Sequence, residues 1–216
     1  MIELRSADKA YWTLHGVVTA LTDIDIAAPG GRVLAVTGGA GSGKSTLLRL
    51  LALQEAPDAG EVRLFGRPLD VAHAAGLEAI RAQHRITPVE NAHATIRLAL
   101  TDALTKLPRL LLWDDADRDL DGDLPGPALG RIARLAHERG IAVVIAGRDA
   151  SVLARYADDI AVLDDGQLVE FGPADVVPTV LPAGHGTRRG RRPLPPQPAA
   201  RRTGSRLSLF EPALAL

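Results

Sequence analysis

The sequence predicts an α/β fold in which helices flank a mostly parallel sheet and a small antiparallel β-subdomain is attached. One basis for this prediction is that short apolar runs, with the length of buried parallel strands, alternate with segments of helical pattern. The other basis is a glycine-rich loop that stands between one such strand and the helix after it. The chain has 216 residues and a hydrophobic content of 46%, so it can bury one substantial core.

The β-subdomain is predicted from the first part of the chain. Short β-like runs occupy residues 2–5 and 10–27, and the turn-forming residues Gly16 and Asp23 interrupt the second of them. A turn over residues 29–31, which are Pro-Gly-Gly, then leads into the next strand. We therefore expect several short strands here rather than a helix.

A strand, a loop and a buried helix follow. Residues 32–37 form the predicted strand, and the leucines after the glycine-rich loop predict a helix that is buried on most sides. Residues 57–60 end that helix, and alternation over residues 61–65 predicts a further strand before a turn at 66–68.

The second half of the chain repeats this alternation. The apolar residues 110–113 predict a buried strand, Pro127 begins a helix that ends at Gly140, and residues 141–146 predict another buried strand. Residues 160–171 predict a hairpin around the turn Asp-Asp-Gly.

The glycine-rich loop has the spacing G-x-x-x-x-G-K-[ST] of a phosphate-binding loop. Glycine lets successive backbone N–H groups curl round a phosphate, and the following helix directs its positive end at the same anion. Lys44 would reach the terminal phosphates, and the hydroxyl of Ser45 would hold a magnesium ion. An ordinary glycine-rich turn is the alternative, but the strand before and the helix after favour a P-loop NTPase core. The predicted nucleotide-binding residues of the loop are Gly38, Gly39, Ala40, Gly41, Ser42, Gly43, Lys44, Ser45 and Thr46.

Composition excludes several classes of site. The chain has no cysteine, so it has no disulfide framework, no thiolate metal site and no cysteine nucleophile. The longest apolar stretches are far shorter than a membrane span, and the start shows no basic segment followed by an apolar core. We expect a cytoplasmic protein that is not exported.

The charge is distributed unevenly. The net charge is −1, yet residues 181–216 hold seven arginines and a single acidic residue, Glu211, together with many prolines. This segment has no periodic apolar face, so we expect a folded domain over residues 1–180 and a disordered tail over 181–216. A basic tail is either simply solvated or binds anionic lipid or nucleic acid, and we expect no specific nucleic-acid partner.

The order of pieces from residue 15 to residue 69 resembles the nucleotide-binding subunits of ATP-binding cassette (ABC) transporters, and its sequence is HGVVTALTDIDIAAPGGRVLAVTGGAGSGKSTLLRLLALQEAPDAGEVRLFGRPL. In that family a residue just before the stretch A-L-x-D-[IV]-[DS], which is residues 20–25 here, stacks on adenine and is usually a tyrosine. The resemblance assigns that role to His15, with Tyr11 and Trp12 slightly upstream; alternatively these residues pack the β-subdomain. The closing hairpin, with VLDDGQLVEFG, also resembles the family.

The stretch RLLLWDDADRDLD, residues 109–121, resembles the family's second nucleotide motif. The resemblance implies that Asp114 positions magnesium and that Asp115 stands where the family has the glutamate that orients the attacking water. Aspartate is one methylene shorter, and a displacement of about an ångström can lower a rate about 100-fold. A helix cap or a turn is the alternative for paired aspartates. Asp121 resembles the aspartate of the loop that connects two facing subunits.

Two departures from the family concern the γ-phosphate. Arg148 replaces the family's histidine in Gly-Arg-Asp, residues 147–149. Arginine can neutralise transition-state charge but cannot relay a proton, and a solvated loop arginine is equally consistent. Residues 90–94, Glu-Asn-Ala-His-Ala, occupy the place of the signature Leu-Ser-Gly-Gly-Gln, and none of the five matches.

A third departure is the short separation between Lys44 and Asp114. The family's helical subdomain, which docks on a membrane partner, is therefore expected to be reduced or absent. No clear glutamine-loop residue is present, although Gln83 is the nearest glutamine.

The resemblance implies an ATP-binding subunit of an ABC-type transport system, with ATP and magnesium as ligands and Lys44, Asp115 and Arg148 in a weakened hydrolytic site. It implies a second ABC ATPase subunit, identical or different, and a membrane permease as partners, and so a location at the inner face of the membrane. One alternative is a non-hydrolysing regulatory or scaffold subunit that pairs with a complete ABC ATPase. A nucleoside or metabolite kinase is disfavoured because no acceptor site or lid is recognisable.

Overall fold

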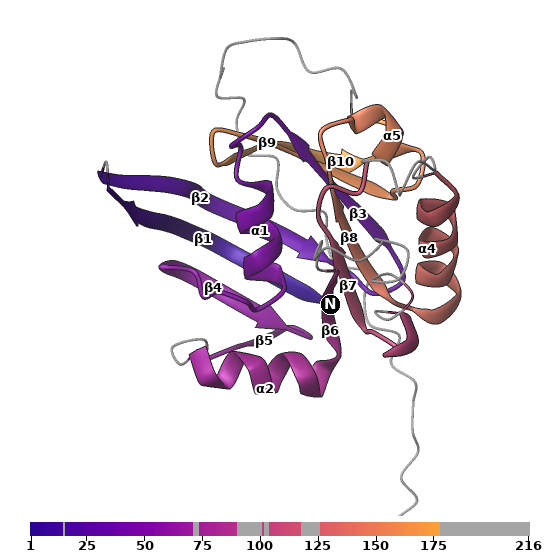
Figure 1. Ribbon diagram of the computed structural model, residues 1–216, viewed down its shortest axis with the longest axis horizontal. Helices are drawn as coiled ribbons and strands as arrows, with labels where there is room; N and C mark the ends of the chain where they lie inside the picture. Colours follow the sequence, from indigo (N-terminus) through magenta and orange to yellow (C-terminus); the bar gives the residue numbers. More distant parts are fainter. Residues whose placement is uncertain (15, 71–73, 90–100, 102–103, 118–125, 178–216) are drawn as a thin grey trace, which may run out of the picture.

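The computed structural model describes residues 1–14, 16–70, 74–89, 101, 104–117 and 126–177. Its strands form two sheets that face each other across a helix (Figure 1). Within the described ranges no helix combines the length and the apolar character needed to cross a bilayer.

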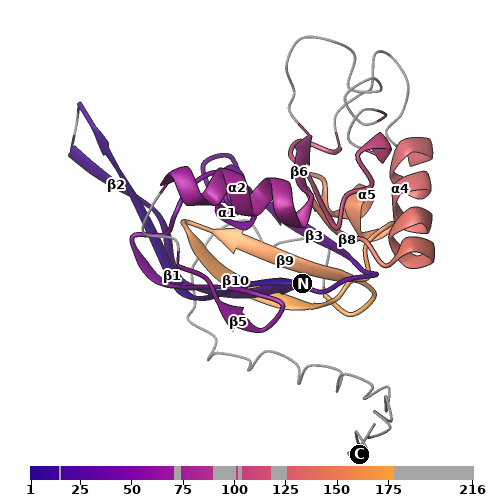
Figure 2. The same cartoon turned by 90° about the horizontal axis from the view of Figure 1, so that it is seen from below.

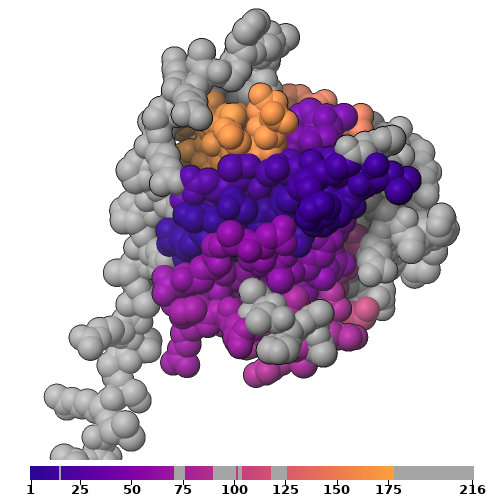
Figure 3. Space-filling model, turned by 90° about the vertical axis from the view of Figure 1, so that its left-hand side faces the viewer, coloured from indigo at the N-terminus to yellow at the C-terminus, as the bar shows by residue number. Residues whose placement is uncertain are grey.

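The smaller sheet is antiparallel and has the strand order β2-β1-β4-β5. It contains β1 (Ile2–Thr13), β2 (Gly16–Ala28), β4 (Ala59–Leu64) and the short β5 (Arg67–Pro68). The far ends of β1 and β2 project well beyond the rest of the sheet (Figure 2). Figure 3 shows the indigo residues of β1 and β2 between β4 on one side and the orange C-terminal strands on the other, where β2 contacts β10.

The larger sheet has the order β10-β9-β3-β8-β7-β6. Its strands are β3 (Val33–Gly38), β6 (Ile86–Val89), β7 (Leu110–Trp113), β8 (Ala142–Ala146), β9 (Asp159–Asp164) and β10 (Gln167–Pro173). All neighbouring pairs are parallel except β9 and β10, which form an antiparallel hairpin. Parallel strands with helical crossovers bring their carboxyl ends to one edge, which is where ligands bind in open α/β sheets.

The described helices cover both faces of the larger sheet. They are α1 (Lys44–Leu51), α2 (Ala74–His84), α4 (Gly126–Arg139) and α5 (Ala150–Ala154). Helix α1 lies between the two sheets, and α4 and α5 lie on the opposite face of the larger sheet (Figure 1).

Two apolar cores result from the alternation of side chains along the central strands. On β3, Leu34 and Val36 face the core that holds α1 and the antiparallel sheet. Val33 and Ala35 face the second core, beside the helix α4. Both faces of β3 are fully buried, which explains why its sequence is an unbroken apolar run.

The structure confirms the predicted α/β class, and it corrects the prediction at the start of the chain. The sequence predicts short runs with a break at Asp23, whereas β1 and β2 are long strands and β2 continues through Asp23. Asp23 has a φ of 51°, and its N–H donates to Asp8 Oδ1 at 2.7 Å. A local register shift therefore absorbs the turn residue without ending the strand.

The sequence pattern does not predict helix α2, strand β6 or the short helix α5, and the short strand β5 lies in the predicted turn at 66–68. Helix α2 and strand β6 both lie between the phosphate-binding loop and β7, where the family's helical subdomain is expected to be reduced. Residues 71–73 and 90–100, which flank these elements, lie outside the described residues. Strand β6 forms the edge of the larger sheet through its parallel pairing with β7.

Candidate functional site

The glycine-rich loop joins the carboxyl end of β3 to α1, as the sequence predicts. Three of its glycines, Gly38, Gly41 and Gly43, have φ values of 147°, 76° and 100°, which side chains rarely adopt. A Cβ at Gly38 would also overlap the carbonyl oxygen of Leu163. Spacing alone suggests these glycines; the structure shows that conformation requires all three and that packing also requires Gly38.

The turn of the β9–β10 hairpin contacts the glycine-rich loop through backbone hydrogen bonds. The N–H of Gly166 donates to the carbonyl of Ser42 at 3.2 Å, and Thr22 N–H donates to the carbonyl of Gly166 at 2.8 Å. A Cβ at Gly43 would lie 2.6 Å from the carbonyl oxygen of Ala20. The loop, strand β2 and the hairpin turn therefore pack backbone to backbone.

Lys44 is the first residue of α1, and its side chain folds back into the loop. The ammonium donates to the carbonyl oxygens of Gly38 at 2.9 Å and Gly39 at 2.6 Å, and to Ser42 Oγ at 3.3 Å. Burial lowers the pKa of Lys44, and Asp114 opposes this shift while the nearby Arg148 adds to it. The structure thus brings three predicted site residues into one electrostatic neighbourhood.

Ser45 and Asp114 line the same cavity, which has a volume of 360 Å³ and also contacts Pro88 and Val89 of β6. A serine hydroxyl and a carboxylate are oxygen donors, the ligand type that magnesium prefers. The donor set therefore fits a magnesium ion shared with phosphate oxygens. This placement follows from topology, because α1 begins where β3 ends and Asp114 follows the parallel strand β7.

Asp115 continues the chain in a left-handed conformation, with a φ of 51°. Its N–H donates to Asp114 Oδ1 at 2.9 Å, so the Asp114 side chain is hydrogen-bonded to the backbone of Asp115. Aspartate tolerates this region of φ better than most residues. Both side chains are half-buried.

Asp117 is a site residue that the sequence analysis misses. Its carboxylate accepts the N–H groups of Arg148 and Asp149, each at 2.6 Å. A Cβ at Gly147 would lie 2.5 Å from the same carboxylate, so any larger residue there would displace the Asp117 side chain. The only sequence signal is a third aspartate after the β7 strand.

Arg148 itself is exposed and lies at the turn between β8 and α5. Thr37 Oγ1 donates to its carbonyl oxygen at 3.4 Å, and Asp117 holds its N–H. The backbone at this position is therefore fixed from two sides, while the guanidinium faces solvent close enough to Lys44 to affect its pKa.

The aromatic candidates for adenine have different surroundings. The Tyr11 hydroxyl donates to Glu55 Oε2 at 2.6 Å, and the Arg49 guanidinium lies 5.8 Å from its ring centroid. Burial and the Glu55 bond raise the pKa of Tyr11, whereas a hydrogen bond with Thr46 of the loop lowers it. Trp12 is 88% exposed. His15 lies outside the described residues.

Three other parts of the predicted site also lie outside the described residues. They are the signature position at residues 90–94, Asp121 and the basic segment 181–216.

Comparison with known proteins is consistent with this geometry. The family model "ABC transporter" matches residues 21–96. The chain is 26% identical over 223 residues to a methionine import ATP-binding protein, MetN of Xylella fastidiosa, covering 80% of this chain and 67% of that protein. It is 28% identical over 209 residues to a hemin import ATP-binding protein, HmuV of Thermobifida fusca, covering 74% and 73%.

Solved structures show the same fold. The dimeric ATP-binding cassette MJ0796, in a post-hydrolysis state bound to ADP and Pi, superposes with a TM-score of 0.70 at 19% identity. That alignment covers 81% of this chain and 99% of the cassette. A nucleotide-free ATP-binding cassette from an ABC transporter gives a TM-score of 0.65 at 16% identity.

Proposed function

We propose that the chain is an ATP-binding subunit of an ABC transport system, that it binds magnesium ATP at its glycine-rich loop, and that it hydrolyses ATP slowly. ABC cassettes bind ATP, and the solved relative MJ0796 is bound to ADP and Pi. The proposal rests mainly on the position of the Lys44 ammonium. The ammonium donates to carbonyl oxygens of a loop whose glycines have positive φ values, and Asp114 and Arg148 are close enough to influence its pKa.

The loop residues 38–46 supply the phosphate site in this proposal. Backbone N–H groups at the start of α1 would donate to phosphate oxygens, and Lys44 would neutralise their charge. For adenine stacking we propose His15, with Tyr11 and Trp12 as the alternatives. Tyr11 is the member of this set that the structure places beside a loop residue, Thr46.

Ser45 and Asp114 would hold the magnesium ion, because both line the 360 Å³ cavity beside the loop. Bound magnesium supplies Lewis-acid stabilisation of phosphate charge. Asp114 also accepts the Asp115 N–H, so the protein fixes the orientation of this carboxylate through its own backbone. We propose these two residues as the magnesium ligands of the chain.

Hydrolysis requires a group that orients water and a group that stabilises the developing charge. We propose Asp115 for the first role and Lys44 with Arg148 for the second. Asp115 is shorter than glutamate, and the missing reach lowers the expected turnover about 100-fold or more. Asp117 keeps the backbone of residues 148–149 in place and so acts as a positioning residue.

The relatives support a proposal for the wider assembly. MetN and HmuV are named import ATP-binding proteins, and the MJ0796 cassette is dimeric. We propose that residues 1–180 form the ATP-binding domain, that it pairs with a second ABC ATPase subunit, and that the pair attaches to a permease at the cytoplasmic face of the membrane. The segment 181–216 is proposed as a separate tail.

Phosphate release from ATP by the purified chain tests the proposal. With magnesium present, the wild-type chain is expected to release phosphate slowly, and Lys44→Ala is expected to reduce release to background. Asp115→Asn is expected to abolish release while leaving ATP binding intact, because the amide cannot orient water as a base. Binding is measured in parallel by calorimetry. Equal release by the wild-type chain and Lys44→Ala would refute hydrolysis.

The geometry of Asp115 favours a second candidate function, in which ATP is bound but not hydrolysed. The Asp115 side chain is short, its backbone has a φ of 51°, and its N–H donates to Asp114 Oδ1. In this case the chain is a regulatory or scaffold subunit that binds ATP without hydrolysing it and pairs with a complete ABC ATPase. ATP binding that depends on Lys44, together with no release above background, would establish this alternative.

A further inference from the structure

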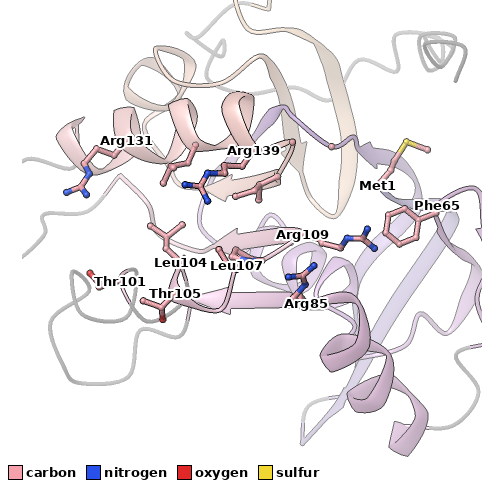
Figure 4. Close-up of a pocket in the computed structure, with 15 residues that line it drawn as sticks. Met1, Phe65, Arg85, Thr101, Leu104, Thr105, Leu107, Arg109, Arg131 and Arg139 are labelled. Carbon is pink, nitrogen blue, oxygen red and sulfur yellow. The ribbon is translucent and has the colours of Figure 1, made fainter. Parts of the chain in front are cut away.

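A second cavity lies where the parallel strands β6, β7 and β8 begin, and Figure 4 shows the side chains that line it. Its volume is 760 Å³, which is within the range of small-molecule sites. The residues just before three parallel strands line it, namely Arg85 before β6, Arg109 before β7 and Ile141 before β8. The phosphate loop follows the carboxyl end of β3, so the two sites occupy opposite ends of the strands.

Four arginines line this cavity, two from the residues just before β6 and β7 and two from α4. Arg85 and Arg109 are held together by the backbone, because Arg109 N–H donates to the Arg85 carbonyl at 3.0 Å. Arg131 and Arg139 are separated by two helical turns and, with Leu135 between them, form one stripe of α4. The adjacent stripe of α4, formed by Leu129, Ile132 and Ala136, is buried in the core, so the arginine stripe lies beside the buried face of the helix.

The described lining of the cavity concentrates positive charge. Among the described residues that line it, none is an aspartate or a glutamate. Among the residues that the structure describes, no ion pair joins any of these four guanidinium groups to a carboxylate. Arg109 lies 5.4 Å from the ring of Phe65, a contact that leaves its N–H edge available. Like charges gathered at one cavity repel one another, and a bound anion would relieve that repulsion.

The rest of the lining is apolar. Leu104, Leu107, Leu135 and Ile141 contribute to the same cavity as the arginines. Figure 4 shows Leu104 and Leu107 near the centre of the view, with Arg109 and Arg85 on one side and Arg139 above. A site that joins guanidinium forks to apolar side chains suits a ligand with an anionic group and an apolar group.

We propose that this cavity binds a small organic phosphate, a phosphate monoester with an apolar substituent. Arg85, Arg109 and Arg139 hold the phosphate, because guanidinium groups match phosphate oxygens in bidentate pairs. The leucines contact the substituent. This site is separate from the nucleotide site, and nothing in the proposal depends on ATP hydrolysis.

Calorimetric titration of the full chain with 1-naphthyl phosphate tests the proposal. The wild-type chain and Lys44→Ala are expected to bind it equally, because the phosphate loop is not involved. Arg109→Gln and Arg139→Gln are each expected to weaken binding about tenfold or more, since a charge-assisted contact is lost. Arg134→Gln is the matched control, because Arg134 is exposed on α4 but does not line the cavity, and it is expected to bind as the wild type does.

Two related compounds test which part of the probe is bound. 1-Naphthol lacks the charge and inorganic phosphate lacks the apolar group, so both are expected to bind more weakly than 1-naphthyl phosphate. Hydrogen exchange of the wild-type chain is expected to slow near residues 85, 109 and 139 when 1-naphthyl phosphate is added.

Four results would overturn the proposal. They are no binding of 1-naphthyl phosphate, binding that is lost in Lys44→Ala, binding unchanged in both Arg109→Gln and Arg139→Gln, and exchange protection that is confined to the phosphate loop. Binding to phosphatidylcholine vesicles that contain phosphatidic acid, without binding of 1-naphthyl phosphate, would assign the arginines to a lipid headgroup and also overturn it.

Discussion

Gly38 and Gly39 are neighbours in the loop but have different constraints. Gly38 has a φ of 147° and no room for a Cβ, whereas Gly39 has nothing within 4 Å of the position where a Cβ would lie. We expect Gly38→Ala to abolish ATP binding, because the backbone must move away from Leu163, and Gly39→Ala to keep measurable binding. Calorimetry with magnesium ATP on both variants checks this expectation, and equal affinities would contradict it.

Asp117 gives a second prediction at the residue scale. Asp117→Ala removes the acceptor of two N–H groups and is expected to lower the free energy of unfolding by about 1 kcal/mol, since both bonds are exposed. It is also expected to lower kcat for ATP more than it raises KM, because Arg148 loses its fixed backbone. Asp117→Asn keeps one acceptor oxygen, so its kcat and its free energy of unfolding are expected to lie between those of the wild type and Asp117→Ala. An Ala variant with wild-type kcat would contradict the positioning role.

The sequence predicts Lys44, Ser45 and Asp114 because each has a fixed place relative to a glycine or to the end of an apolar strand. It does not predict Asp117, because the partners of that carboxylate lie about thirty positions later, at residues 148 and 149. Spacing along the chain carries no record of that contact; it appears only when β7 and β8 pair.

At the scale of elements, Asp149 caps the first turn of helix α5 and directly follows Arg148 in the chain. The Asp149 carboxylate accepts from the N–H groups of Ser151 and Val152 and from the Ser151 hydroxyl. The Ser151 hydroxyl and the Val152 N–H lower the pKa of Asp149 below its ordinary value. This contribution to stability is complete above about pH 4, the ordinary value for aspartate, and is lost as the pH falls through the lowered pKa.

Asp149→Asn is therefore expected to flatten the fall in unfolding free energy below about pH 4, because asparagine caps a helix without titrating. Urea unfolding at pH 7 and at a series of acid pH values measures this slope. Asp165→Asn, in the hairpin turn, controls for the loss of one negative charge. An unchanged acid slope in Asp149→Asn would contradict the prediction.

The predicted elements are those with strong local patterns, such as β3, β8 and the β9–β10 hairpin. Strand β6 has the sequence Ile-Thr-Pro-Val, which is short and contains a proline. Proline is tolerated in a strand at a sheet edge, and β6 is the edge strand beside β7. Its strand character comes from pairing with β7, so local sequence could not predict it.

At the scale of the whole molecule, the described nucleotide-site residues all precede residue 150, and β9 and β10 complete the sheet by residue 173. A chain that ends at residue 180 is expected to bind ATP with the affinity of the full chain and to unfold in one cooperative transition. Calorimetry and thermal melting of both chains measure this. Loss of ATP binding on removal of residues 181–216 would place that segment in the ATP-binding domain and refute the proposed boundary.

The Lys44 ammonium already has three oxygen partners within its own loop. A phosphate that contacts this ammonium therefore takes part in an exchange, because it must compete with the carbonyls of Gly38 and Gly39 and with the Ser42 hydroxyl. The contribution of this lysine to nucleotide affinity is the difference between two hydrogen-bonded arrangements of its ammonium. The hydrogen bonds between the Lys44 ammonium and the loop hold the loop in shape without a ligand. They also lower the net free energy gained when the loop binds an anion, because some of them are lost on binding.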